Sequence, residues 1–124
     1  MSLEIEIYTE AKVAKRIQLT GVLDTDTAPI LQARIDQEIK PENSVVILDL
    51  ANLEFLSSAG VQVIFKLKKT VAANTGEFFL VNIKPHIQKV FDIIKALDKL
   101  NLGIFNSIEE MDEYLAAMQN KVKG

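Results

Sequence analysis

Hydrophobic and polar residues alternate at the start of the chain, over residues 3–8, where Leu3, Ile5 and Ile7 are the hydrophobic positions. Such alternation is typical of a strand with one buried face. The same pattern returns over residues 13–19 after a short turn. We therefore expect the two segments to pair as an antiparallel hairpin.

A helical period follows a polar cluster at residues 24–27, which supplies candidates for the N-cap. The hydrophobic positions of this first helix are three or four residues apart: Ala28, Leu31, Ile35 and Ile39. Residues 41–43, Pro-Glu-Asn, are expected to end it.

An unbroken hydrophobic run at Val45–Leu48 predicts a strand over 45–50 that is buried on both faces of a sheet. A loop through Asn52 should then lead into a second helix. The expected inner face of this helix consists of five residues: Val61, Ile64, Phe65, Val71 and Ala72. Gly76 is available for a left-handed cap at its end.

The last third of the chain repeats this alternation of strand and helix. A strand is predicted at 78–83, a helix after Pro85, and a short strand at 102–105. Ser107–Glu110 has the form of a capping box before a last helix. Its expected inner face is Ile108, Met111, Leu115 and Met118.

The predicted order is thus β-β-α-β-α-β-α-β-α, in which strands joined through helices pair in parallel by right-handed crossovers. We expect an α/β fold with a mixed sheet of four to five strands, an N-terminal antiparallel hairpin and about four helices. Residues 1–124 should form one domain, with an ordered core over approximately 3–118.

Composition narrows the possible functions. The net charge of −3 gives no basic surface for nucleic acid or anionic lipid, and the absence of cysteine excludes disulfides and thiol chemistry. No hydrophobic stretch reaches the roughly 18 residues that span a bilayer. We therefore expect a cytoplasmic protein that binds no nucleic acid and does not insert into membranes.

The sequence Ser57-Ser58-Ala59-Gly60 is the most informative stretch, because it lies between a predicted strand and a predicted helix. The simplest interpretation is that Ser57 or Ser58 caps the helix, which is worth about 1 kcal/mol. Gly60 then needs a reason of its own, since glycine inside a helix costs about 1 kcal/mol relative to alanine. Either close approach of another backbone or packing against the sheet would supply it.

The residues around these serines give little support for a catalytic site. A nucleophile elbow requires Gly-x-Ser-x-Gly, and position 56 is leucine. His86 is the only histidine, and no phosphate-binding glycine loop is present. Acidic residues near the expected strand ends, such as Asp24 and Asp49, lack the spacing of metal ligands. We predict no catalytic residues, no cofactor and no metal.

Two segments resemble the signatures of STAS domains, specifically those of bacterial anti-sigma-factor antagonists. Residues 49–61, Asp-Leu-Ala-Asn-Leu-Glu-Phe-Leu-Ser-Ser-Ala-Gly-Val, are similar to the longer signature. Residues 21–24, Gly-Val-Leu-Asp, followed by Thr27-Ala28, are similar to the second. The predicted order of elements also resembles the STAS fold over essentially the whole chain.

The resemblance implies a regulatory switch. In such antagonists a serine at the start of the second helix is phosphorylated by an anti-sigma factor that is itself a serine kinase, and a serine phosphatase resets the cycle. The serine at the matching position is Ser58, with Ser57 as the alternative. The resemblance also implies a partner-binding surface, formed by Asp24, Thr25, Ser57, Ser58, Ala59, Gly60 and Gln62.

The chain departs from the family pattern at two of these positions. Ser57 stands where phosphorylated members usually carry aspartate, and Gln62 stands where glycine is usual. A STAS module that is not phosphorylated is therefore an alternative, either as a scaffold or signalling subunit or as a subunit of a lipid-transport complex. Another alternative is a nucleotide-binding STAS module with a ligand near Asp24 and Ser58. In either case we expect a monomer or a weak dimer.

Overall fold

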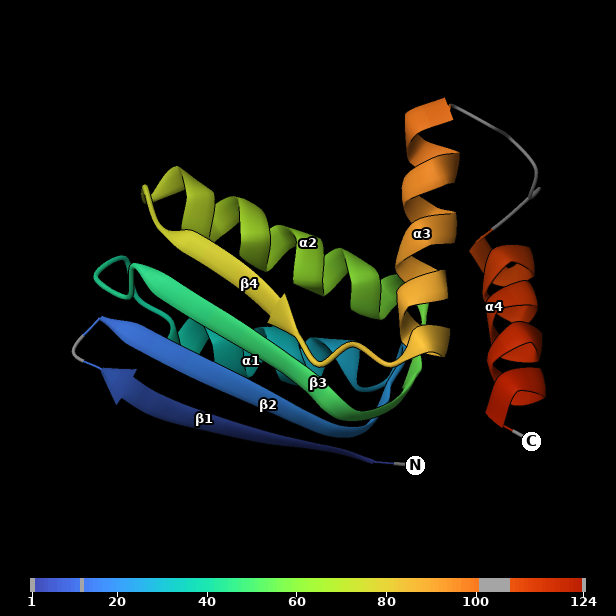
Figure 1. The fold of residues 1–124 in the computed structure, drawn as a ribbon, viewed down its shortest axis with the longest axis horizontal. Coiled ribbons are helices and arrows are strands. Elements are labelled where there is room, and N and C mark those ends of the chain that lie inside the picture. Colours follow the sequence, from blue (N-terminus) through green and yellow to red (C-terminus); the bar gives the residue numbers. More distant parts are fainter. Residues whose placement is uncertain (1, 12, 101–107, 124) are drawn as a thin grey trace.

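A four-stranded sheet forms the centre of the computed structural model, which describes residues 2–11, 13–100 and 108–123 (Figure 1). The strands lie in sequence order: β1 (Leu3–Ala11), β2 (Ala14–Leu23), β3 (Val45–Leu56) and β4 (Glu77–Val81). β1 and β2 pair antiparallel, whereas β2 with β3 and β3 with β4 pair parallel. The predicted mixed sheet and its N-terminal hairpin are confirmed.

The helices occupy two places around the sheet. α1 (Ala28–Glu38) and α2 (Ser58–Ala73) lie against one face, behind the strands in Figure 1. α3 (Pro85–Leu100) and α4 (Ile108–Lys123) stand side by side at the end where the parallel strands finish. The prediction of about four helices is confirmed, and the strand predicted at 102–105 lies outside the described residues.

The core lies between the sheet and α1 and α2. Ile17, Leu48, Leu31 and Ile64 represent its layers, and each is no more than 1% exposed. Burying one such side chain contributes about 1.5–3 kcal/mol. This burial explains why α1 and α2 lie against the sheet through the hydrophobic positions of their sequence.

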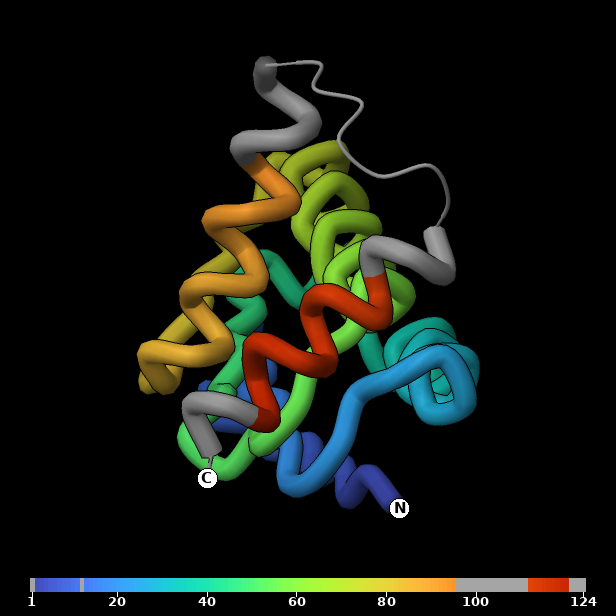
Figure 2. The backbone as a smooth tube through the Cα atoms, turned by 90° about the vertical axis from the view of Figure 1, so that its right-hand side faces the viewer, coloured from blue at the N-terminus to red at the C-terminus, as the bar shows by residue number. Residues whose placement is uncertain are grey.

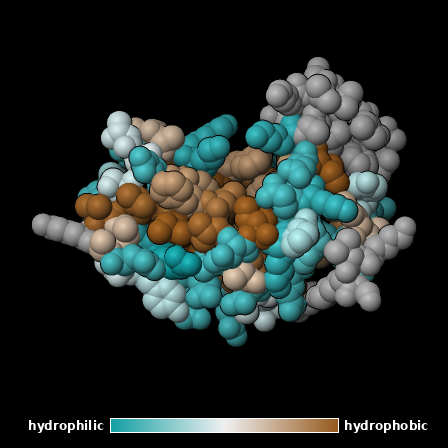
Figure 3. Space-filling view, viewed as in Figure 1, coloured by the Kyte–Doolittle hydropathy of each residue, from teal (hydrophilic) through white to brown (hydrophobic). Residues whose placement is uncertain are grey.

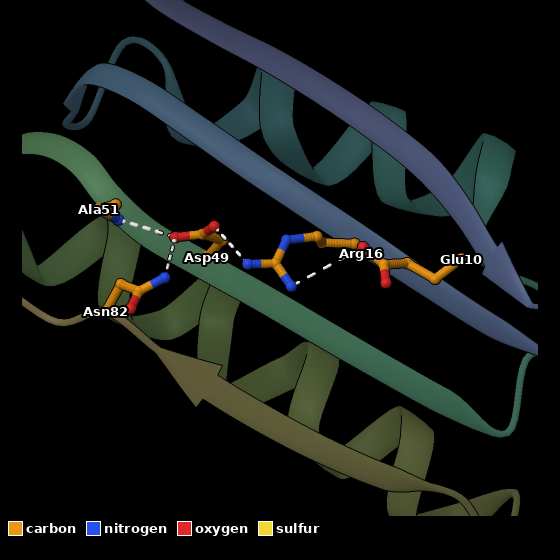
Figure 4. A network of polar contacts seen from close by, with 5 residues as sticks. All are labelled: Glu10, Arg16, Asp49, Ala51 and Asn82. Atoms are coloured by element: carbon orange, nitrogen blue, oxygen red, sulfur yellow. Dashed lines mark hydrogen bonds and ion pairs between the residues drawn. The ribbon is translucent and has the colours of Figure 1, made fainter.

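The other face of the sheet carries no helix in Figure 1 and shows a hydrophobic band among polar residues in Figure 3. Ile47 of β3 lies on this face, opposite Phe79 of β4 and Arg16 of β2 in the register. Arg16 donates a hydrogen bond to Asp49 at 2.7 Å, within a polar network that also includes Asn82 (Figure 4).

Asp49 is the buried charge of this network. Burial raises its pKa, but three hydrogen bonds, from the Ala51 N–H, the Arg16 guanidinium and the Asn82 amide, together with the Arg16 charge, outweigh burial. The pKa of Asp49 is consequently lowered. Asp49 therefore stays ionised in the folded protein and helps to fix the register of β2 against β3.

β3 is longer than predicted, because the segment after Leu50 is strand rather than loop. Leu53 and Leu56 are fully buried, so the hydrophobic face continues past the polar Asn52. β2 accommodates the extension through irregularities in its pairing with β3, between Gln18 and Thr20 and between Gly21 and Val22. β4 stops opposite Asp49, so of the described strands β2 alone pairs with the last part of β3.

Two details of α2 also differ from the prediction. Leu67 is buried where it was not expected, and Ala72 is exposed because it lies on the outer side of the last turn. The left-handed residue after the helix is Thr75, with φ 58°, rather than Gly76. Gly76 instead permits close packing, since a Cβ there would lie 2.7 Å from the Ser44 carbonyl oxygen.

Candidate functional site

The loop between β2 and α1 forms one wall of the site. Its Asp24 Oδ1 accepts hydrogen bonds from the backbone N–H groups of Asp26 and Thr27 at 2.9 and 3.0 Å. Thr27 is the N-cap residue of α1 without a side-chain cap, because its hydroxyl oxygen accepts from the Asp24 N–H at 2.9 Å instead and its hydroxyl proton is donated to the Val22 carbonyl at 2.9 Å. These bonds fix the loop and leave Thr25 exposed.

The two adjacent serines have different roles at the start of α2. Ser57 is the N-cap residue, and its Oγ accepts a hydrogen bond from the Gly60 N–H at 3.4 Å. Ser58 is the first residue of the helix. The predicted helix cap is therefore Ser57, which frees the hydroxyl of Ser58 for another contact.

Gly60 is explained by the packing of side chains against the sheet, and not by another backbone that approaches it closely. A Cβ on Gly60 would lie 2.7 Å from Cγ of Leu23 and 2.8 Å from Cδ1 of Leu56, and both leucines are fully buried. The first turn of α2 can thus approach the ends of β2 and β3 only with glycine at this position.

Substitution Gly60→Ala is expected to lower the free energy of unfolding by about 1–2 kcal/mol, because overpacking costs about 1–3 kcal/mol and the helical preference of alanine offsets up to ~1 kcal/mol. Urea denaturation followed by circular dichroism measures the change. The matched control is Ala73→Gly, at the exposed end of the same helix, where no packing is involved. An increase in stability for Gly60→Ala would contradict the packing requirement.

The hydroxyl of Ser58 is covered by α4. Asp112 Oδ1 accepts hydrogen bonds from Ser58 Oγ at 2.7 Å and from the Ser58 N–H at 3.0 Å. Ser58 is only 3% exposed as a result. A carboxylate at this place is favourable, because the N-terminus of a helix has free N–H groups and a positive dipole end.

A second polar contact joins α4 to β3. The Gln119 amide accepts a hydrogen bond from the Leu56 N–H and donates one to the Leu56 carbonyl, both at 2.8 Å. Gln119 is 1% exposed, and Leu115, one turn earlier, is fully buried. α4 thus crosses the carboxyl end of the sheet directly over the start of α2, as Figure 2 shows.

Hollows separate α4 from the loop and the strand ends. An open one of about 430 Å³ is lined by residues that include Asp24, Thr25, Ser57, Asp112 and Glu113. A narrower cavity of about 270 Å³ lies beside it, between β2, β3 and α4. The described residues that line them include the carboxylates Asp24, Glu54, Asp112 and Glu113 and no basic residue, so this described lining is negatively charged.

The structure brings most of the predicted site residues together. Asp24, Thr25 and Ser57 line the open hollow, and Ser58 lies beside it beneath Asp112. Ala59 is half-buried, Gly60 is buried and Gln62 is exposed on the first turns of α2. Their functional roles stay predictions, since geometry alone does not assign a partner.

Sequence reasoning missed Asp112 and Gln119. Gln119 follows Leu115 by four residues, so a polar residue on the inner face of the last helix was a detectable sign of a buried amide. Nothing local marks Asp112, which lies 54 residues from Ser58 in the sequence. The predicted inner-face residues Ile108 and Met111 have side chains outside the described part of the structure.

Some classes of site are absent from the described residues. Within residues 2–11, 13–100 and 108–123, no three or more acidic or histidine side chains cluster as a metal site. No helix in the same part of the chain is long and hydrophobic enough to cross a membrane. His86 is half-buried, and its Nε2 lies 2.8 Å from the Glu54 carbonyl oxygen.

Comparison with known proteins agrees with this arrangement. A family model described as STAS domain matches residues 4–111. The putative anti-sigma factor antagonist BtrV of Bordetella bronchiseptica is 35% identical over 75 residues, which are 60% of this chain and 65% of BtrV, slightly less than two thirds. The anti-sigma F factor antagonist of Paenibacillus polymyxa is 28% identical over 94 residues, 75% of this chain and 80% of that protein.

Solved structures show the same fold. The anti-sigma factor antagonist SpoIIAA in its unphosphorylated form superposes with a TM-score of 0.62 at 23% identity, over 82% of this chain and 100% of that one. The phosphorylated form of SpoIIAA gives a TM-score of 0.63 at 22% identity, over 78% and 99%. At these identities the likeness is one of fold.

Proposed function

Since the chain belongs to the STAS domain family, we propose that it is an anti-sigma factor antagonist whose binding of a partner is controlled by phosphorylation of Ser58. The proposed partner is an anti-sigma factor that is also a serine kinase. A serine phosphatase acting on the phosphorylated form would restore binding. We place this cycle in the cytoplasm, where ATP is available to the kinase.

The observation that carries the proposal is the position of the Ser58 hydroxyl at the N-terminus of α2. Phosphorylation adds about −1.5 to −2 charge, and a helix N-terminus stabilises an anion through its N–H groups and dipole. The fold can therefore retain a phosphate at this position. A partner surface that fits a neutral hydroxyl would lose affinity for the charged form.

The relatives support the proposal, because BtrV and the Paenibacillus protein bear names of anti-sigma factor antagonists. The SpoIIAA structures show that this fold exists in unphosphorylated and phosphorylated forms. A regulatory role also agrees with the described residues around Ser58, which include Asp24, Asp112 and Glu113 but no histidine as a base.

Incubation with ATP and a cognate anti-sigma factor kinase is expected to add one phosphate to the protein, measured by intact mass. Ser58→Ala should abolish the addition. Ser57→Ala is the matched control, since it removes the neighbouring hydroxyl and costs only the helix cap, about 1 kcal/mol. Loss of the phosphate in Ser57→Ala but not in Ser58→Ala would move the site to Ser57. No phosphate on the wild type and none on Asp112→Ala, in which the contact that covers Ser58 is removed, would contradict the proposal.

One observation favours a second candidate, a STAS module that is not switched by phosphate. Both serines already have structural partners, Gly60 for Ser57 and Asp112 for Ser58. In that case the Ser57→Ala and Ser58→Ala variants would bind the partner like the wild type. A nucleotide ligand has less support, because the described residues that line the two hollows are carboxylates and uncharged residues, with no described basic side chain to meet its phosphates.

A further inference from the structure

Ser58 as it stands in this structure is closed to a kinase. Its Oγ–H donates to Asp112 at 2.7 Å, and the side chain is almost completely covered. Phosphoryl transfer replaces the Oγ–H bond by an Oγ–P bond: Oγ displaces ADP from the terminal phosphorus of ATP, and its proton passes to a base of the kinase. An oxygen held under α4 cannot approach that phosphorus.

We propose that α4 is an intramolecular cover of the phosphorylation site, and that α4 and a phosphate on Ser58 exclude each other. The inference rests on the proposed function for its biological meaning, although the contact itself does not. In the closed state Asp112 occupies the start of α2. In the phosphorylated state the phosphate occupies the same place and α4 is displaced.

The phosphate and α4 exclude each other because both place an anion at the start of α2. Asp112 Oδ1 accepts from both the hydroxyl and the N–H of Ser58, so it fills the anion position at the start of α2. A phosphate bonded to Oγ removes the hydroxyl proton and brings its own oxygens to the same N–H group. Two anions then compete in a region whose described lining also includes the carboxylates of Asp24 and Glu113.

The described attachments of α4 beside Asp112 are compatible with its release. Gln119 hydrogen-bonds the Leu56 backbone, Leu115 is fully buried, and Met118 is partly buried against the core. Glu113, Tyr114 and Ala117 are exposed, and the 270 Å³ cavity lies between the helix and the strand ends. Among the described side chains of α4, Leu115 and Gln119 are the buried ones, and a helix end with exposed neighbours opens at lower free energy than the core elements.

The test measures the position of α4 without any kinase. The chain contains no cysteine, so Lys66→Cys on α2 and Ala117→Cys on α4, both at exposed positions, can carry nitroxide labels. Pulsed electron paramagnetic resonance should give one narrow short distance for the unmodified protein. Phosphoserine installed at position 58 during translation should move at least half of that population to longer, broader distances.

Variants without phosphate provide the control. Asp112→Ala should also create a longer-distance population, whereas Glu113→Ala, which removes the same charge from the adjacent exposed position, should not. An unchanged distance with phosphoserine at position 58 would overturn the proposal, as would equal effects of Asp112→Ala and Glu113→Ala. Circular dichroism checks that the phosphoserine protein is folded, and if it is not, the comparison of the two alanine variants decides.

The proposed function fails by a different measurement. If the kinase adds no phosphate to the wild type or to Asp112→Ala, the switch is wrong, whatever the labels report. If the kinase does act on Ser58, the cover predicts at least a tenfold faster reaction for Asp112→Ala than for Glu113→Ala. Equal rates would retain the phosphorylation site and reject the cover.

Discussion

Replacement of Leu56 by alanine is expected to lower the free energy of unfolding by about 2–5 kcal/mol. Leu56 is fully buried at the end of β3, where it contacts the start of α2 through Gly60. The loss combines the burial of the deleted atoms with the cavity left between strand and helix. Urea denaturation at neutral pH measures it from the shift of the midpoint at constant m-value.

The matched control is Asn52→Ala, an exposed position on the same strand, for which the change should stay within about 0.5 kcal/mol. A double-mutant cycle adds a sharper test of the same packing. Because Cδ1 of Leu56 is one of the atoms that a Cβ on Gly60 would meet, Gly60→Ala should cost less beside Leu56→Ala than alone, by about 0.5–1 kcal/mol. Strict additivity would contradict the contact.

The second large effect is expected for Asp49→Ala, which should lower the free energy of unfolding by about 2–4 kcal/mol at pH 7. The variant removes the acceptor of three hydrogen bonds and leaves Arg16, whose side chain is 28% exposed, without its carboxylate at 2.7 Å. Arg16 retains only the more distant Glu10 at 3.8 Å. The ion pair that joins β2 to β3 on the face of the sheet without helices is thus lost.

The same carboxylate predicts how this stability depends on pH. The pKa of Asp49 is lowered in the folded protein, so its contribution is present above the unfolded value of about 3.9 and is lost as pH falls through the folded value. The difference between the wild type and Asp49→Asn should therefore shrink below about pH 4. Urea unfolding of both proteins from pH 7 downwards measures it.

Glu42→Gln, which changes an exposed carboxylate, is the control for the acid series and should leave the difference from the wild type constant. A difference between the wild type and Asp49→Asn that stays constant through the acid range would mean that Asp49 does not carry this stability. A difference that grows on acidification would reverse the sign and would contradict the network of Figure 4.

Hydrophobic periodicity was sufficient to predict the order of the elements from β1 to α3 and the last helix α4, whereas the strand predicted at 102–105 lies outside the described residues. The run of valine, isoleucine and leucine at the start of β3 predicted a central strand, and the three- and four-residue spacing in α1 predicted its buried face. These features depend on residues close together in the sequence. Each of these elements buries one continuous face, so the spacing of its hydrophobic residues is enough to identify the element.

The end of β3 shows where this reasoning fails. Asn52 and Glu54 are exposed on either side of the buried Leu53, and a polar residue inside a hydrophobic segment predicts a loop. The strand continues because β2 extends alongside it through irregular pairing. Register irregularities depend on a neighbouring strand, so the single segment contains no sign of them.

The candidate site likewise contains residues that local sequence identifies and residues that it does not. Ser57, Ser58 and Gly60 were identified because small residues between a strand and a helix have few structural explanations. Asp112 was not, because an acidic residue in the first turns of an amphipathic helix is ordinary. Only the packing of α4 across the sheet makes its carboxylate the partner of Ser58.

The part of β3 that extends beyond β4 has an edge where, among the strands that the structure describes, none pairs with its backbone groups. Side chains take that place, since His86 contacts the Glu54 carbonyl and Gln119 pairs with both backbone groups of Leu56. An unpaired edge is a template for strand addition by another chain. Gln119 therefore ends the sheet at this edge and, with His86, protects the protein from assembly through its longest strand.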